Sequence, residues 1–169
     1  MNDETLFLFT TKMRIASIRS MDVSNGEGCG VALFTQGCPI HCFNCFNKNT
    51  WDFDGGIKYE QKHEDLIIKL LNKKHITRLS ILGGEPLIKR NIEPIEKLIK
   101  RVREVYGKNK KIWLYTGQYF EDVKEMYPEI IKNVDVLIDG PYVDSERDFN
   151  LKWCGSRNQR VIDIEDMLG

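Results

Sequence analysis

Thr77-Arg-Leu-Ser-Ile-Leu-Gly-Gly-Glu-Pro86 is the segment around which the rest of the chain can be arranged. Residues 77–82 carry enough apolar and β-favouring side chains for a buried strand, and Gly83-Gly84 ends it. A helical pattern follows, with Asn91 as the candidate N-cap and Pro94 tolerable in the first turn. The apolar stripe of this helix comprises Ile92, Ile95, Leu98, Ile99 and Val102. A second strand at 111–115 ends at Thr116-Gly117, so the segment predicts two parallel strands joined by a helix.

The same alternation of strand and helix patterns extends along the chain. Strands are predicted at residues 13–19, 31–35, 77–82, 111–115, 134–138 and 160–164. Further helices are predicted at 59–73, with Leu66, Ile67, Leu70 and Leu71 on one stripe, and at 120–132, interrupted or restarted at Pro128. Residues 36–49 are predicted to form a loop. The pattern indicates an α/β fold with a mostly parallel sheet and helices outside.

The length of the chain limits how far such a sheet can close. A closed eight-unit barrel usually needs at least ~200 residues, and this chain has 169. We therefore expect an open partial (βα) barrel, whose open side is covered by something else, such as a substrate protein. Residues 13–169 are predicted to form a single domain, preceded by an N-terminal extension at 1–12.

Composition excludes several classes of protein. Lys plus Arg and Asp plus Glu are both 25, which argues against a dedicated nucleic-acid binder. No apolar run approaches the ~18 residues of a membrane helix. The start, Met1 to Phe9, has acids where a signal peptide needs bases, so we expect a cytoplasmic chain. In that compartment its five cysteines are expected to be ligands or catalytic groups rather than disulfides.

The densest group of reactive side chains is Cys38-Pro-Ile-His-Cys42-Phe-Asn-Cys45, a C-x3-C-x2-C spacing in the predicted loop. Three thiolates this close can converge on one metal centre. Structural zinc would need a fourth ligand, for which His41, Cys29 or Cys154 could be recruited. The alternative is an iron–sulfur cluster with three protein ligands and one open iron.

This spacing resembles that of the radical S-adenosylmethionine superfamily. The resemblance implies a [4Fe-4S] cluster on Cys38, Cys42 and Cys45, with S-adenosylmethionine bound at the open iron and cleaved to a 5′-deoxyadenosyl radical. Gly83-Gly-Glu-Pro86 is more often only a turn. Here it matches the superfamily motif that holds the methionine amino group, with Gly83, Gly84 and Glu85 as the binding turn.

Further stretches of the sequence narrow the resemblance from the superfamily to one family within it. They include Phe34-Thr-Gln-Gly-Cys-Pro39, Trp113-Leu-Tyr-Thr-Gly117, Val136-Leu-Ile-Asp-Gly-Pro141 and Trp153-Cys-Gly-Ser-Arg-Asn-Gln-Arg160. Together they resemble the activating proteins of anaerobic ribonucleoside-triphosphate reductases, from about residue 13 to 164. The resemblance implies formation of a glycyl radical on the large reductase subunit, with an electron donor such as flavodoxin. It also implies that the backbone of Asn44, Cys45 and Phe46 lies near the adenine.

For several other residues the sequence leaves more than one role open. Thr116 and Asp139 end strands and are candidate cofactor contacts, or only turn residues. The basic stretch 97–111 is a solvated helix face or a docking patch, and Arg157 and Arg160 could contact partner or cofactor. His41 is expected to face solvent or lie behind the ligands. Two other functions remain: an activator of another glycyl-radical enzyme, and a non-catalytic zinc-binding interaction module.

Overall fold

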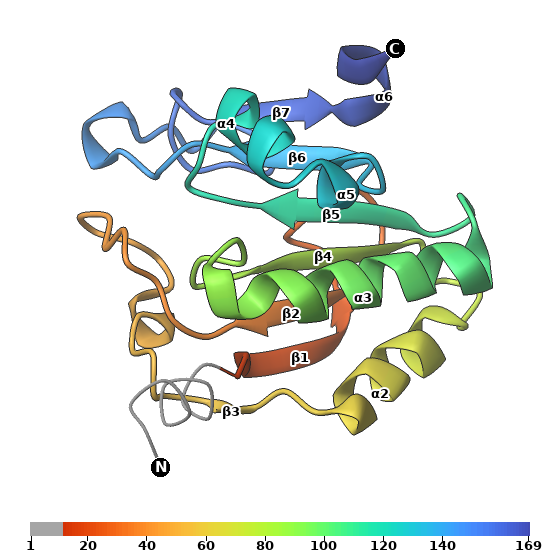
Figure 1. Ribbon diagram of the computed structural model, residues 1–169. Helices are drawn as coiled ribbons and strands as arrows, with labels where there is room; N and C mark the ends of the chain where they lie inside the picture. The colour runs from red at the N-terminus through yellow and green to blue at the C-terminus, as the bar shows by residue number, and fades with distance from the viewer. Residues whose placement is uncertain (1–11) are drawn as a thin grey trace.

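The computed structural model describes residues 12–169, which contain one seven-stranded sheet with helices packed on it (Figure 1). The strands are ordered β3-β1-β2-β4-β5-β6-β7 across the sheet. The predicted extension at 1–12 and the expectation based on Met1 to Phe9 lie outside the described residues, apart from Lys12.

The elements follow the predicted alternation closely. The strands are β1 (Arg14–Asp22), β2 (Gly30–Thr35), β3 (Ile57–Lys58), β4 (Arg78–Gly83), β5 (Lys111–Tyr115), β6 (Val136–Asp139) and β7 (Arg160–Asp163). The helices are η1 (Lys48–Thr50), α2 (Gln61–Leu71), α3 (Lys89–Tyr106), α4 (Phe120–Met126), α5 (Pro128–Ile131), η2 (Asp144–Glu146) and α6 (Ile164–Leu168). The sequence patterns missed β3, α6 and the two short 3-10 helices.

The centre of the sheet is parallel and its edges are antiparallel. β2, β4, β5 and β6 run in the same direction, which confirms the predicted parallel strand pairs. β1 and β7 are antiparallel to β2 and β6, and β3 is antiparallel to β1. The edge strands reverse because no crossover helix separates them from their neighbours, as a parallel connection requires.

The main core lies between the sheet and the α-helices. In Figure 1, α2 and α3 run in front of the sheet, and α4 and α5 lie on the same side. Two details of the helix predictions were wrong. Leu66 is exposed on α2, whose buried residues include Ile67 and Leu71. Asn91 is a buried residue inside α3, which begins two residues earlier, and Pro94 therefore lies beyond the first turn.

The opposite side of the sheet, which we call the helix-free face, has a second and smaller cluster. Ala32, Phe34 and Leu82 form it, with Ala16 and Tyr115 packed against them. None of these five residues belongs to a helix. In place of a layer of α-helices, two mostly irregular segments border this face: the floor loop, residues 23–29, and the C-terminal strap, residues 141–159, which contains the short 3-10 helix η2.

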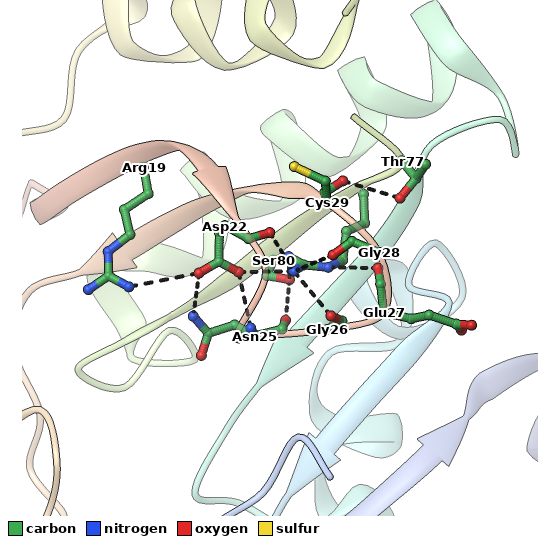
Figure 2. A network of polar contacts seen from close by, with 10 residues as sticks. Arg19, Asp22, Asn25, Gly26, Glu27, Gly28, Cys29, Thr77 and Ser80 are labelled. Atoms are coloured by element: carbon green, nitrogen blue, oxygen red, sulfur yellow. Dashed lines mark hydrogen bonds and ion pairs between the residues drawn. The ribbon is translucent and has the colours of Figure 1, made fainter. Parts of the chain in front are cut away.

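The floor loop is fastened by a buried ion pair (Figure 2). The Arg78 guanidinium lies 3.0 Å from the Asp22 carboxylate, and it also donates to the main-chain oxygens of Gly26 and Glu27. Ser80 accepts from Arg78 and donates to the oxygen of Asn25. These contacts link the beginning of β4 to a loop about 50 residues away in sequence, and so hold the floor of the cavity described below.

Among the residues that the structure describes, no helix has both the length and the apolar character needed to cross a bilayer.

Candidate functional site

A cavity of about 510 Å³ opens where the central strands end. It receives the cysteine loop, residues 36–51, after β2, the Gly83–Glu85 turn after β4, and Thr116-Gly117 after β5. The C-terminal strap closes another side. Figure 1 shows the cysteine loop in orange and the strap in blue, both beyond the carboxyl ends of β2 and β5. This is where parallel sheets place their sites, because strands of one direction end at one edge.

Main-chain hydrogen bonds hold the cysteine loop against the neighbouring turn. Gly37 N donates to Thr50 O over 2.7 Å, and Cys38 N donates to Trp51 O over 3.2 Å. Glu85 N donates to Gly37 O over 2.9 Å. A Cβ atom at Gly84 would lie 2.3 Å from Gly37 O, so only glycine allows this approach. The two predicted motifs are therefore in direct contact.

All three cysteines of the loop line the cavity as free thiols. Cys38 is only 9 % exposed, and burial raises the pKa of both Cys38 and Cys42. Cys45 N donates to Cys42 O, and Cys45 Sγ accepts from Asn47 N. As placed, no three Cys, His, Asp or Glu side chains of residues 12–169 form a ready metal site.

The ligands proposed for a closed zinc site are mostly elsewhere. The His41 ring stacks on Trp51, with centroids 4.4 Å apart, and does not line the cavity. Cys29 precedes β2, at the opposite end of the sheet, where its main-chain oxygen accepts from Thr77 N. Cys154, by contrast, lines the same cavity as the three loop cysteines. A donor set of three thiols on one loop, all lining one cavity, fits a cluster that keeps one iron open.

Glu85 lies at the centre of the turn and is 3 % exposed. Its Oε1 accepts from Leu87 N and Thr116 Oγ1, at 3.0 and 2.7 Å, and its Oε2 accepts from Gly117 N at 2.7 Å. Burial raises the pKa of this carboxyl, while the three donors oppose the increase. A carboxylate has about four acceptor positions, so one remains for a donor in the cavity. A ligand ammonium group would suit it in charge and geometry.

Comparison with known proteins identifies the family. The family described as 4Fe-4S single cluster domain matches residues 24–162. An anaerobic ribonucleoside-triphosphate reductase-activating protein of Escherichia coli K12 is 38% identical over 144 residues, covering 83% of this chain and 92% of that protein. The protein of the same name from phage T4 is 38% identical over 151 residues, covering 88% and 93%. The chain belongs to this family of activating proteins. The family predicted from the sequence motifs is confirmed.

In this member of the family, most of the predicted cofactor residues share the cavity. They are Cys45, Phe46, Gly83, Gly84, Glu85 and Thr116. Asn44 is not among the lining residues, and its side chain donates to Asp144. Asp139 is also outside the lining, because its buried carboxylate accepts from Arg160 and from Phe120 N. Arg160 binds Asp139 and Glu121 and so joins β7 to its neighbours, which is a structural role.

The sequence motifs left several cavity residues of this family member unassigned. Arg19, Tyr115, Tyr142, Trp153 and Gln159 all line the cavity. A partial signal was present, because Trp153 and Gln159 lie in the Trp153–Arg160 stretch that carried the narrow resemblance. Tyr115 likewise lies in the Trp113–Gly117 stretch that carried the resemblance, but no role was assigned to its side chain.

The Trp153–Arg160 stretch fastens the C-terminal strap beside the cavity. Gln159 Oε1 accepts from Gly155 N at 2.9 Å, and its Nε2 donates to Gly140 O at 3.1 Å. Asn158 Nδ2 donates to Pro141 O at 2.7 Å. Both ends of the strap are thereby tied together, so the amide side chains in this stretch determine the position of one cavity wall.

The basic stretch at 97–111 lies on α3, the turn after it and the first residue of β5, and none of it lines the cavity. Arg101 pairs with Glu64, and Arg103 pairs with Asp135. Lys100 and Lys108 also have acidic partners. Because its charges are largely balanced within the chain, the stretch fits a solvated helix face better than a docking patch.

Proposed function

We propose that the chain holds a [4Fe-4S] cluster through Cys38, Cys42 and Cys45, binds S-adenosylmethionine beside it, and generates a glycyl radical on the large subunit of an anaerobic ribonucleoside-triphosphate reductase. The observation that supports this is a single cavity lined by the cysteine loop and by the Glu85 turn. When bound and reduced, the cluster supplies the electron that cleaves S-adenosylmethionine to methionine and the 5′-deoxyadenosyl radical, which takes a hydrogen atom from the glycine Cα.

The residues of the chain have separate tasks in this proposal. The three thiolates hold the cluster and leave one iron for the cofactor. Glu85 accepts a hydrogen bond from the cofactor ammonium through its free position, while Thr116 and Gly117 keep the carboxylate in place. Gly84 lets the turn approach the cysteine loop closely, and Gly117 leaves room for the Ile40 side chain, because a Cβ atom there would lie 2.3 Å from Ile40 Cδ1. Phe46 offers a ring, and Asn44 to Phe46 a backbone, for the adenine.

The wider setting of the reaction is part of the proposal. Residues 13–169 form one radical S-adenosylmethionine domain, in which the sheet is an open partial (βα) barrel and the helix-free face is its inside. The cavity excludes bulk water on the side of the strap, and the partner covers the remaining opening. An electron donor such as flavodoxin supplies the electron. A cytoplasmic location suits free thiols, which that compartment keeps reduced.

One anaerobic experiment tests the function. The chain is incubated with S-adenosylmethionine, a reductant and the large reductase subunit, and electron paramagnetic resonance is recorded. A glycyl radical signal that requires all four components is the expected result. A chain that carries iron and sulfide yet gives no such signal would contradict the assigned partner, and a chain that carries only zinc would contradict the chemistry.

Replacing Glu85 with alanine is expected to weaken S-adenosylmethionine binding by about 10- to 150-fold, because one charged hydrogen bond is lost. The iron content should remain that of the wild type, since no cluster ligand is changed. Isothermal titration calorimetry measures the affinity, and iron analysis measures the cluster.

Glu104→Ala is the matched control, because Glu104 is an exposed glutamate on α3. Thr116→Val leaves the charge of the Glu85 carboxylate in place and tests its support. It replaces with a methyl group the hydroxyl that donates to Glu85 Oε1 and accepts from Gln118 N. A smaller loss than in Glu85→Ala is expected there. Wild-type affinity in Glu85→Ala would remove this residue from the cofactor site.

A further inference from the structure

The helix-free face forms the deep wall of the cavity. Phe34 of β2, Leu82 of β4 and Tyr115 of β5 lie on it, and all three line the cavity. Arg19 reaches this wall from β1, with its Cζ 4.4 Å from the centre of the Phe34 ring. The wall adjoins the Glu85 turn, because Leu82 and Tyr115 directly precede Gly83 and Thr116, and all four residues line the same cavity.

Two hydrogen-bond donors on this wall have no acceptor of their own. The Tyr115 hydroxyl makes no hydrogen bond with any residue between 12 and 169, and burial raises its pKa, so it is a neutral donor. Arg19, whose side chain is 56% exposed, lies over the Phe34 ring and makes a 3.8 Å ion pair with Asp22, but its guanidinium makes no hydrogen bond with any residue between 12 and 169. The Asp22 carboxylate is already occupied by Arg78 and Asn25. The wall therefore offers a phenol and a guanidinium to a ligand that brings acceptors.

A polypeptide main chain is such a ligand. In the proposed function a glycine Cα must enter the cavity, and its segment must leave the partner's own fold to do so. The carbonyl oxygens of that segment then lose their partners, which is costly unless they are paired again. Glycine has no side chain that a binding site could recognise, so the main-chain groups near it are the groups available for hydrogen bonds.

We propose that Arg19 and Tyr115 bind main-chain carbonyl groups of the glycine-bearing segment of the reductase large subunit. This inference rests on the proposed function and adds a substrate-binding wall to it. The three loop cysteines and the Glu85 turn serve the cofactors, whereas the helix-free face and the exposed rim of the cavity serve the protein substrate.

The mouth of the cavity supports entry by a protein segment. Phe46 on the cysteine loop is 64 % exposed, and Phe149 on the C-terminal strap is 82 % exposed. The Arg147 guanidinium lies 5.3 Å from the Phe46 ring centre and 4.3 Å from that of Phe149. Exposed aromatic side chains around an arginine are typical of the centres of protein interfaces. This surface is continuous with the cavity through Phe46, which lines it.

The decisive variant is Tyr115→Phe, which removes one hydroxyl and keeps the ring. Glycyl radical formation is measured against the concentration of the reductase large subunit, together with the 5′-deoxyadenosine released. The expected result is an apparent KM for the reductase about 3- to 10-fold higher, the effect of one lost neutral hydrogen bond. More deoxyadenosine should be released per glycyl radical, since the substrate is held less well. Arg19→Gln should raise the KM by at least as much.

Tyr127→Phe is the matched control, because Tyr127 lies at the junction of α4 and α5 and packs against the main core on the helix side. It should give the wild-type KM. The inference is overturned if Tyr115→Phe and Arg19→Gln keep the wild-type KM for the reductase. It is also overturned if they weaken S-adenosylmethionine binding by the same factor, since the wall would then serve the cofactor. A wild-type chain that never forms the glycyl radical contradicts the proposed function instead, so the two failures are distinguishable.

Discussion

Alanine at Cys38, Cys42 or Cys45 is expected to remove most of the bound iron and all cleavage of S-adenosylmethionine. Each thiol lines the same cavity, and the three are carried by one loop that the Glu85 turn holds in place. A cluster that keeps one iron open for the cofactor has no spare protein ligand. Removal of any one of the three thiols should therefore by itself prevent stable binding of the cluster. Iron and sulfide analysis after anaerobic purification, with deoxyadenosine release, provides the measurement.

Cys29→Ala is the matched control for the loss of a thiol, because Cys29 lies at the other end of the sheet. It should keep both iron and cleavage. Cys154→Ala is a more demanding comparison, since Cys154 shares the cavity. We expect it to keep the iron as well. Full activity in any variant of the three loop cysteines would refute the cluster assignment, whereas loss of metal in Cys154→Ala would favour a four-ligand site.

Asp22→Ala is expected to lower the free energy of unfolding by about 3–5 kcal/mol, the usual cost of removing one partner of a buried ion pair. The Arg78 and Asp22 side chains are 1% and 2% exposed. An arginine cannot lose its charge in a protein, so the variant leaves a buried cation with carbonyl and hydroxyl acceptors only. For a chain of this size the melting temperature should fall by about 6–20 °C. Thermal unfolding by circular dichroism under anaerobic conditions measures it.

Ser80→Ala tests the same network without removing a charge. Ser80 accepts from Arg78 and donates to Asn25 O, as Figure 2 shows, so its loss should cost about 1–3 kcal/mol. If Asp22→Ala destabilises the chain no more than Ser80→Ala does, the charge of the pair is not what holds the floor loop.

Local sequence patterns were sufficient to predict most of the fold. The bounds of the strand at 111–115 were predicted to the residue, and the predicted interruption at Pro128 is the boundary between α4 and α5. They were not sufficient for the start of α3. Asn91 is a good N-cap by residue type, yet it is buried inside the helix, because packing of the apolar stripe decides where this helix begins. The direction of β7 was also beyond the reach of local patterns.

The candidate site also has features that local sequence patterns predict and features that only tertiary packing decides. The cysteine spacing and the Gly83–Glu85 turn are short, contiguous motifs, so the sequence by itself was enough to predict a cluster loop and a cofactor turn, and to assign the family that the comparisons confirm. Which groups remain available to a ligand depends on partners far along the chain. Asp139 is occupied by Arg160, 21 residues away, whereas Tyr115 and Arg19 line the cavity. Only the tertiary structure decides this, because a polar side chain is free or engaged according to what folding brings within hydrogen-bond distance of it.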